Sequence, residues 1–259
     1  MTPVNRAEWL ETFDARVRRR ARPDSTRARV EDTGAVVRQV AGPDGWNGVL
    51  WSGLGDDAAE VIAAQRDHFA ALGVECEWKL YGHDLPADLP RLLTEAGFVP
   101  EPTETVMVAA TADVAAAPVL PPGVVLVPVT DAEGVERAAR LHARVFGVDP
   151  GGLRKRLLRR LAEAPGTEVA VMAEAAEGPV SVARLECDGD GFAGLWGGAT
   201  LPHWRGRGLY RALVAHRAGR AAAAGVGYLY VDARDTSRPI LARLGFQALT
   251  TTTPFVWRP

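Results

Sequence analysis

Residues 201–217, LPHWRGRGLYRALVAHR, alternate two arginines with two glycines immediately before an amphipathic stretch. The first amides of a helix have no intrahelical acceptor and the helix dipole adds a partial positive charge, so an anion such as pyrophosphate can bind there. Gly206 and Gly208 carry no Cβ, which lets the backbone approach such an anion closely. Three arginines would supply charge and fork-shaped donors: Arg205, Arg207 and Arg211.

The glycine spacing of this loop matches neither GxxxxGK[ST] nor GxGxxG, which disfavours a nucleotide P-loop or a dinucleotide fold. A basic turn that is simply solvated is the alternative interpretation, and most short runs of this composition are such turns. The run lies between an apolar strand-like segment and an amphipathic helix. This position favours a loop that holds phosphate.

The residues after 123 show hydrophobic patterns of alternating strands and helices. Thr130 or Asp131 is a good cap for the first helix, and Gly225 is a natural end for the helix after the basic loop. Gly178-Pro179 and the run DGDG at 188–191 predict antiparallel hairpins. The expected strands are 124–129, 168–175, 179–187, 192–201, 228–233 and 250–257; the expected helices are 130–146, 153–164 (basic on its outer side), 209–225 and 237–245.

The first part of the chain repeats this order in a shorter form. Residues 48–54 (GVLWSGL) are similar to residues 193–199 (AGLWGGA). The segments after the first run are also similar to the segments after the second run, in the same order. Trp51 and Gly73 are 22 positions apart, whereas Trp196 and Gly225 are 29 apart. The difference equals the length of PHWRGRG, so the first copy is expected to lack the basic loop. Chance similarity is the alternative.

The proline-rich segment AAAPVLPPG at 115–123 has the composition of a linker. We therefore expect one domain at 1–115, a linker at 116–122 and a second domain at 123–259, which are ordinary domain sizes.

The motif and the element order together resemble the GCN5-related N-acetyltransferase (GNAT) family. That family binds acetyl-CoA with an Arg/Gln-x-x-Gly-x-Gly/Ala signature, which here reads Arg205-Gly206-Arg207-Gly208-Leu209-Tyr210. The resemblance covers roughly the last 135 residues, and the first part is similar to a degenerate copy. It implies an α/β (α+β) fold of two GNAT-like mixed-sheet domains in tandem, each with a mostly antiparallel central sheet flanked by helices.

The resemblance also implies which backbone groups would contact acetyl-CoA. Residues on the strand before the loop would pair with the pantetheine arm: Ala199, Thr200 and Leu201. The amides of the loop and first helical turn would hold the pyrophosphate: Arg207, Gly208, Leu209, Tyr210 and Arg211. Gly197 and Gly198 would weaken the strand or form a bulge in it.

Two positions depart from the family pattern. Tyr210 stands where the signature ends in a small residue, so its ring must point away from the phosphates or line the pocket beside the pantetheine. Leu241 stands where many members place a tyrosine that protonates the leaving thiolate. The acid would then be another residue or water, or the thiolate leaves unaided.

The chemistry of acetyl transfer to an amine calls for an oxyanion donor and a base. The family takes the donor from a backbone amide on the splayed strand, which places it near Gly198 or Ala199. Glu186, on the preceding strand, is the leading candidate base, with a solvated strand-end carboxylate as its alternative. Asp232 shares a strand face with Tyr228 and Tyr230, where it could bind a cationic acceptor or cap the next helix.

The composition limits the remaining possibilities. The formal net charge is −2 and charged residues make up 24% of the chain, so nucleic acid is not an expected partner. Cys76 and Cys187 are the only cysteines and the histidines are scattered, so we expect no metal site and no disulfide framework. The basic run at 15–29 is expected to be a solvated helix face.

We expect a cytoplasmic protein of bacterial type, without membrane contact and either monomeric or homodimeric, that transfers acetyl from acetyl-CoA to a small-molecule or amino-terminal amine. A non-catalytic acyl-CoA-binding regulatory module is the alternative.

Overall fold

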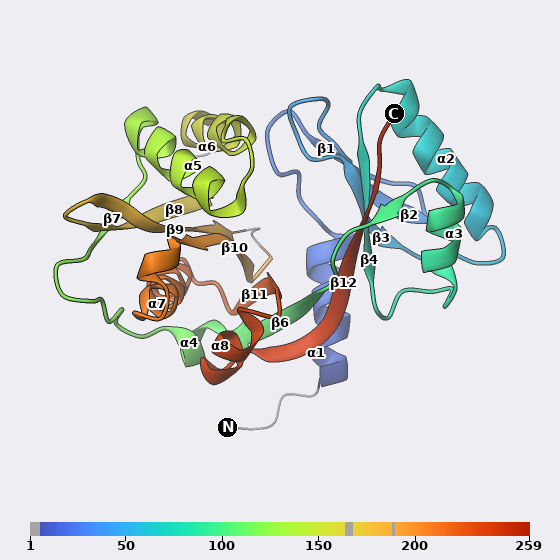
Figure 1. Cartoon of the computed structure of the whole chain (residues 1–259). Coiled ribbons are helices and arrows are strands. Elements are labelled where there is room, and N and C mark those ends of the chain that lie inside the picture. The colour runs from blue at the N-terminus through green and yellow to red at the C-terminus, as the bar shows by residue number, and fades with distance from the viewer. Residues whose placement is uncertain (1–5, 164–167, 188–189) are drawn as a thin grey trace. The chain divides into compact units, whose positions relative to one another are not determined.

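The computed structural model describes residues 6–163, 168–187 and 190–259, which form two compact units (Figure 1). The first unit comprises residues up to Met107 together with Asp232–Arg238 and Ala248–Pro259. The second comprises Val108–Val231 and Pro239–Gln247. Each unit is a mixed α/β structure with a mostly antiparallel arrangement of strands, as the sequence predicts.

The second unit contains the basic loop. Its elements are α4 (Thr111–Val114), β7 (Val125–Pro128), α5 (Ala132–Phe146), α6 (Gly151–Glu163), β8 (Glu168–Ala175), β9 (Gly178–Cys187), β10 (Phe192–Thr200), η2 (Pro202–Trp204), α7 (Leu209–Ala223), β11 (Tyr228–Ala233) and α8 (Arg238–Arg243). Strands β7 to β10 pair antiparallel in chain order, which confirms the predicted hairpins. β10 pairs with β11 in parallel, and α7 connects the two strands. Helices α5 and α6 lie on one face of these strands and α7 on the other (Figure 1).

The helix ends of this unit follow from local sequence. The Asp131 carboxylate accepts a hydrogen bond from the Gly134 amide at 2.7 Å and so caps α5. Gly225 adopts a left-handed conformation after α7, with φ of 72°, and its amide donates to the Ala222 carbonyl. Both termini were expected from the residue types.

The first unit has a similar arrangement of elements. These are α1 (Arg6–Phe13), η1 (Asp14–Arg19), β1 (Arg29–Asp32), β2 (Val36–Val40), β3 (Gly48–Ser52), α2 (Ala58–Ala71), β4 (Cys76–Tyr81), α3 (Leu89–Glu95), β5 (Val99–Pro100), β6 (Glu104–Ala110), which continues into the second unit, and β12 (Gln247–Trp257). Apolar side chains of α2 and α3 pack on one face of β2 to β4 around the fully buried Trp78.

The internal similarity seen in the sequence corresponds to a repeated structural unit. In the first unit, β3 and β4 are parallel and α2 connects them. In the second, β10 and β11 are parallel and α7 connects them. Residues 53–57, between β3 and α2, are too few to form a loop like the one at 201–208. The first copy therefore lacks the basic loop, as expected.

The compact units are not the two consecutive segments that the sequence predicts. β12, at the end of the chain, pairs antiparallel with β4 from Thr252 to Trp257, so these residues complete the sheet of the first unit. A hydrophobic pattern identifies a strand but not the strand with which it pairs. This explains why the sequence does not place β12 in the first unit. Residues 115–121 contain no helix or strand, and the role of 116–122 as a linker stays a prediction.

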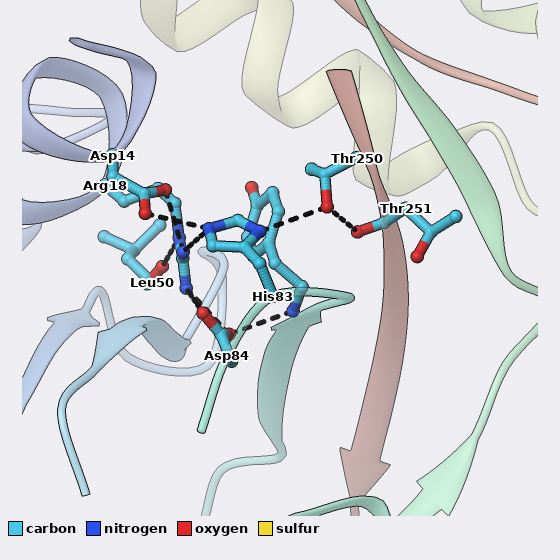
Figure 2. A network of polar contacts seen from close by, with 8 residues as sticks. Asp14, Arg18, Leu50, His83, Asp84, Thr250 and Thr251 are labelled. Atoms are coloured by element: carbon cyan, nitrogen blue, oxygen red, sulfur yellow. Dashed lines mark hydrogen bonds and ion pairs between the residues drawn. The ribbon is translucent and has the colours of Figure 1, made fainter. Parts of the chain in front are cut away.

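The basic run at 15–29 is not wholly a solvated face, because Arg18 is only 1% exposed. Figure 2 shows its guanidinium between two carboxylates: it donates to Asp14 at 2.9 Å and to both oxygens of Asp84 at 2.8 Å. Its Nε donates to the Leu50 carbonyl at 3.1 Å. The expectation of a solvated face is therefore wrong for this residue, which joins η1 to β3 and to the turn after β4.

His83 extends this network within the first unit. Its Nε2 lies 2.8 Å from an Asp14 oxygen, and its Nδ1 lies 3.1 Å from the Thr250 hydroxyl on β12 (Figure 2). Burial opposes ionisation of Asp14, but the His83 hydrogen bond and the Arg18 charge outweigh it and hold the pKa of the Asp14 carboxyl below its usual value. The network thus ties the N-terminal helix to the last strand.

Among the residues that the structure describes, no helix combines the length and the apolar character needed to cross a membrane.

Candidate functional site

The basic loop joins β10 to α7 with both of its ends buried. Leu201 and Leu209 are 4% and 1% exposed and belong to the hydrophobic core of the second unit. Gly206 and Gly208 between them have φ of 75° and 88°, a left-handed conformation that favours glycine. Gly208 is the residue immediately before the first turn of α7. The glycines that the sequence singled out therefore shape the loop.

The amides of this loop are available for a ligand. Within the described part of the chain, no protein acceptor is found for the amides of Gly206, Arg207, Gly208, Leu209 and Arg211. The first helical hydrogen bond runs from the Ala212 amide to the Gly208 carbonyl at 3.0 Å. Leaving aside its chain neighbours, no heavy atom lies within 4 Å of the position that a Cβ on Gly206 would take, and beside Gly208 only the Arg211 guanidinium does, at 3.5 Å. Such a cluster of unpaired amides is the arrangement that binds phosphate.

Contacts around Trp204 hold the loop in this conformation. The Trp204 indole nitrogen donates to the Glu177 carboxylate at 2.7 Å, and its ring packs against the core of the unit. The Arg207 guanidinium lies 4.7 Å from the Trp204 ring centroid. The Arg205 Nε donates to the Thr200 carbonyl at 3.2 Å. Arg205 thus supports the turn, while Arg207 and Arg211 are exposed.

A bulge lies on β10 before the loop. The register between β9 and β10 shifts between Trp196 and Ala199, so Gly197 and Gly198 have no partner on β9. Gly197 has φ of 59°, and a Cβ there would lie 2.9 Å from the Arg184 Nε. The pair of glycines thus forms the bulge that the sequence predicted.

β10 and β11 separate at this bulge. Their pairing runs from Phe192 to Gly194, although β10 continues to Thr200. The edge of β10 away from β9 is therefore not paired with β11 over its last six residues. An extended ligand could add to this edge.

The hydrogen bonds at the end of β10 show which of its backbone groups face β9. The Leu201 amide donates to the Val180 carbonyl at 3.0 Å, and the Ala199 carbonyl accepts from the Ser181 hydroxyl at 2.8 Å. Because consecutive residues of a strand direct their backbone groups to opposite edges, Thr200 presents its groups to the open edge. The Leu201 amide and the Ala199 carbonyl face β9, and the pantetheine contacts of Ala199, Thr200 and Leu201 stay predictions.

Glu186 is paired with two arginines. Its carboxylate accepts from Arg156 on α6 at 2.7 Å and from Arg184 on β9 at 3.2 Å, and its side chain is 12% exposed. It is therefore not a solvated strand-end carboxylate. Arg156 likewise points to the sheet, contrary to the basic outer face expected for this helix. Charge-assisted hydrogen bonds of this kind are stronger than those between neutral groups.

His142 on α5 interacts with the same group of residues. Burial and the charge of Arg184 lower the pKa of its imidazole to about 4. The imidazole is thus neutral at pH 7. No residue pattern points to His142, Arg156 or Arg184, because their association depends on how α5 and α6 pack on the sheet.

Asp232 belongs to the first unit, where its carboxylate pairs with Lys79 on β4 at 2.5 Å. Its second oxygen, Oδ1, is buried and has no hydrogen-bond partner among the described residues, so Asp232 caps no helix. Burial and the Asp232 charge raise the pKa of the nearby Glu104. Lys79 was not identified from the sequence, because 153 positions separate it from Asp232.

Comparison with solved structures identifies the fold. A GCN5-related N-acetyltransferase from Kribbella flavida superposes with a TM-score of 0.69 and 22% identity, covering 98% of this chain and 96% of that chain. A tandem GNAT protein from the clavulanic acid biosynthesis pathway gives 0.62 and 14%, covering 97% and 94%. A GCN5-related N-acetyltransferase from Sphaerobacter thermophilus gives 0.60 and 17%, covering 88% and 83%.

No protein-family model and no curated protein sequence matches the chain. The structural matches extend over nearly the whole chain, so they include both units and not only the part with the loop. The chain therefore has the fold of the GCN5-related N-acetyltransferases, in its tandem form.

Proposed function

We propose that the chain is an acetyl-CoA-dependent N-acetyltransferase that transfers the acetyl group directly to the amine of a small molecule or of a peptide amino terminus. The observation that carries the proposal is the group of amides at the start of α7 for which the described residues offer no protein acceptor: those of Gly206, Arg207, Gly208, Leu209 and Arg211. The fold supports the same activity at the level of the family. Acetyl-CoA is the substrate that the loop would bind.

In this proposal the second unit holds acetyl-CoA at three places along its backbone. The loop amides donate to the diphosphate, and Arg207 and Arg211 add positive charge. Thr200 pairs with the pantetheine arm at the open edge of β10. The amide of Gly198, at the bulge, donates to the oxygen that becomes negative when the amine attacks the thioester carbonyl.

The attacking amine must first lose a proton, and Glu186 is our candidate to accept it, directly or through water. The two arginines beside Glu186 stabilise its anionic form, which makes it a weak base but keeps it deprotonated. Asp232 is the candidate to bind a cationic acceptor. Both roles stay predictions.

A non-catalytic module that binds acyl-CoA and regulates another process is the second candidate. Leu241, at the position of the family's tyrosine acid, is fully buried and apolar, so it cannot donate a proton to the departing thiolate. The ion pairs of Glu186 also favour this alternative. A thiolate is a good leaving group, however, and transfer can proceed without a dedicated acid.

Release of free CoA distinguishes the two functions. The purified chain is incubated with acetyl-CoA and a panel of primary amines and amino-terminal peptides, and the free thiol is followed with a thiol-reactive dye. We expect release that depends on an acceptor. Tight binding of acetyl-CoA without release across the panel would support the module, and absence of binding would contradict both functions.

Replacement of Glu186 by Gln is expected to slow CoA release at neutral pH and to shift the pH–rate profile to higher pH. Without the carboxylate, the amine must lose its proton to solvent, which requires a higher pH. The matched control is Glu136→Gln on α5, which removes a carboxylate paired with Arg140 at 2.7 Å but not assigned to the site. A profile of Glu186→Gln that coincides with the wild-type profile would exclude Glu186 as the base.

A further inference from the structure

Tyr210 replaces the small residue that ends the loop signature, and the structure shows where its ring lies. The ring atoms Cε2 and Cδ2 are 3.2 and 3.7 Å from the position that a Cβ on Gly198 would take. The ring is therefore in van der Waals contact with the bulge of β10. No ring atom of Tyr210 is found within 4 Å of the positions that a Cβ on Gly206 or on Gly208 would take.

The contact with Tyr210 explains why residue 198 is a glycine. A distance of 3.2 Å is closer than ordinary van der Waals contact, so a side chain at 198 would require the ring to move. The backbone of Gly198 remains exposed beside the ring. The Tyr210 ring thus lies beside an exposed glycine of the bulge.

Arg217 lies two turns further along α7 and is buried beneath the helix. It is 1% exposed and donates to the carbonyls of Leu213 at 3.0 Å and Arg184 at 2.9 Å. Burial lowers the pKa of its guanidinium to about 10, and its interaction with the Tyr210 hydroxyl acts in the opposite direction.

We propose that the Tyr210 ring limits the size of the transferred acyl group, so that the chain accepts acetyl-CoA and discriminates against longer acyl-CoA molecules. The inference rests on the proposed function, in which the Gly198 amide binds the thioester oxygen. An acyl group held at that amide must extend beside the ring. A two-carbon group needs little room there, whereas each further methylene must displace the ring or be left without space.

The expected discrimination is measurable with acetyl-CoA and butyryl-CoA. Each additional methylene that does not fit a pocket reduces kcat/KM by about tenfold or more, so two methylenes give a ratio of about 100 in the wild-type chain. Tyr210→Ala is expected to lower this ratio at least tenfold, mainly by improving the use of butyryl-CoA. Tyr210→Phe should keep the wild-type ratio, because the ring and not the hydroxyl limits the size.

The experiment measures kcat/KM for both thioesters by CoA release, and in parallel the dissociation constants of both by calorimetry. Arg220→Ala, at an exposed position on α7, is the control and should leave the ratio unchanged. Tyr210→Leu is a second variant that lacks the aromatic ring, and it replaces Tyr210→Ala if that variant does not fold.

The outcomes are distinct. An unchanged ratio in folded Tyr210→Ala or Tyr210→Leu that still binds acetyl-CoA overturns the role of Tyr210 and leaves the proposed function intact. If the wild-type chain binds neither thioester, the proposed function and the inference both fail. If it binds both without turnover, the ratio of dissociation constants tests the ring in the same way.

Discussion

Gly208→Asp is expected to raise the dissociation constant of acetyl-CoA by at least about 100-fold. The new carboxylate would stand at the start of α7, where a Cβ lies 3.5 Å from the Arg211 guanidinium, and would repel the diphosphate. It would also force a residue with a side chain into φ of 88°. Hydrogen bonds to charged groups contribute about 1.5–3 kcal/mol each, so loss of two corresponds to a factor of about 100 or more.

The matched control for this variant is Gly225→Asp at the other end of α7. Gly225 also has a positive φ, 72°, and no heavy atom lies within 4 Å of its Cβ position. The control therefore introduces the same charge and similar backbone strain, far from the loop along the helix. Calorimetry should show near wild-type affinity for Gly225→Asp. Equal affinity in Gly208→Asp and the wild type would remove the loop from acetyl-CoA binding.

Arg18→Met is expected to lower the free energy of unfolding by about 3–5 kcal/mol, because it leaves a buried carboxylate without its partner. The Asp84 side chain is 4% exposed; it accepts two hydrogen bonds from Arg18 and one from the neutral Tyr81 amide, so the variant removes the charged partner. Methionine keeps most of the apolar volume of the arginine side chain, so the decrease in the free energy of unfolding is due chiefly to removal of the charge. Urea unfolding followed by circular dichroism measures the effect.

Arg91→Met is the control for this second experiment. Arg91 also pairs with two carboxylates, those of Asp88 and Glu95, but its side chain is 57% exposed. An exposed pair contributes about 0–1 kcal/mol, so the control should unfold close to the wild type. Similar midpoints for the two variants would mean that the network in Figure 2 contributes little to the stability of the first unit.

The loop and the bulge could be predicted because their signals are local. Gly206 and Gly208 mark the turn by their residue type, and Gly197 and Gly198 mark the bulge in the same way. The cap at Asp131 is equally local. Such features depend on a few consecutive residues, and the sequence therefore contains nearly all of the information that determines them.

The other contacts depend on positions that are distant in the chain. Glu186 meets Arg156 because α6 packs across β9, and Asp232 meets Lys79 because β4 and β11 are brought together by the fold. The pairing of β12 with β4 is of the same kind. Residue patterns identify a charged residue or a strand, but they do not specify which residue or strand it contacts. Arg18 was misassigned for this reason.

The most direct test of the account is a calorimetric titration of the wild-type chain with CoA and, separately, with pantetheine, which lacks the diphosphate and the 3′-phosphoadenosine attached to it. The loop amides can act only on the diphosphate, so CoA should bind at least about 100-fold more tightly than pantetheine. Equal affinities for the two ligands, or no detectable binding of CoA, would contradict the assignment of the loop between β10 and α7 as a diphosphate site.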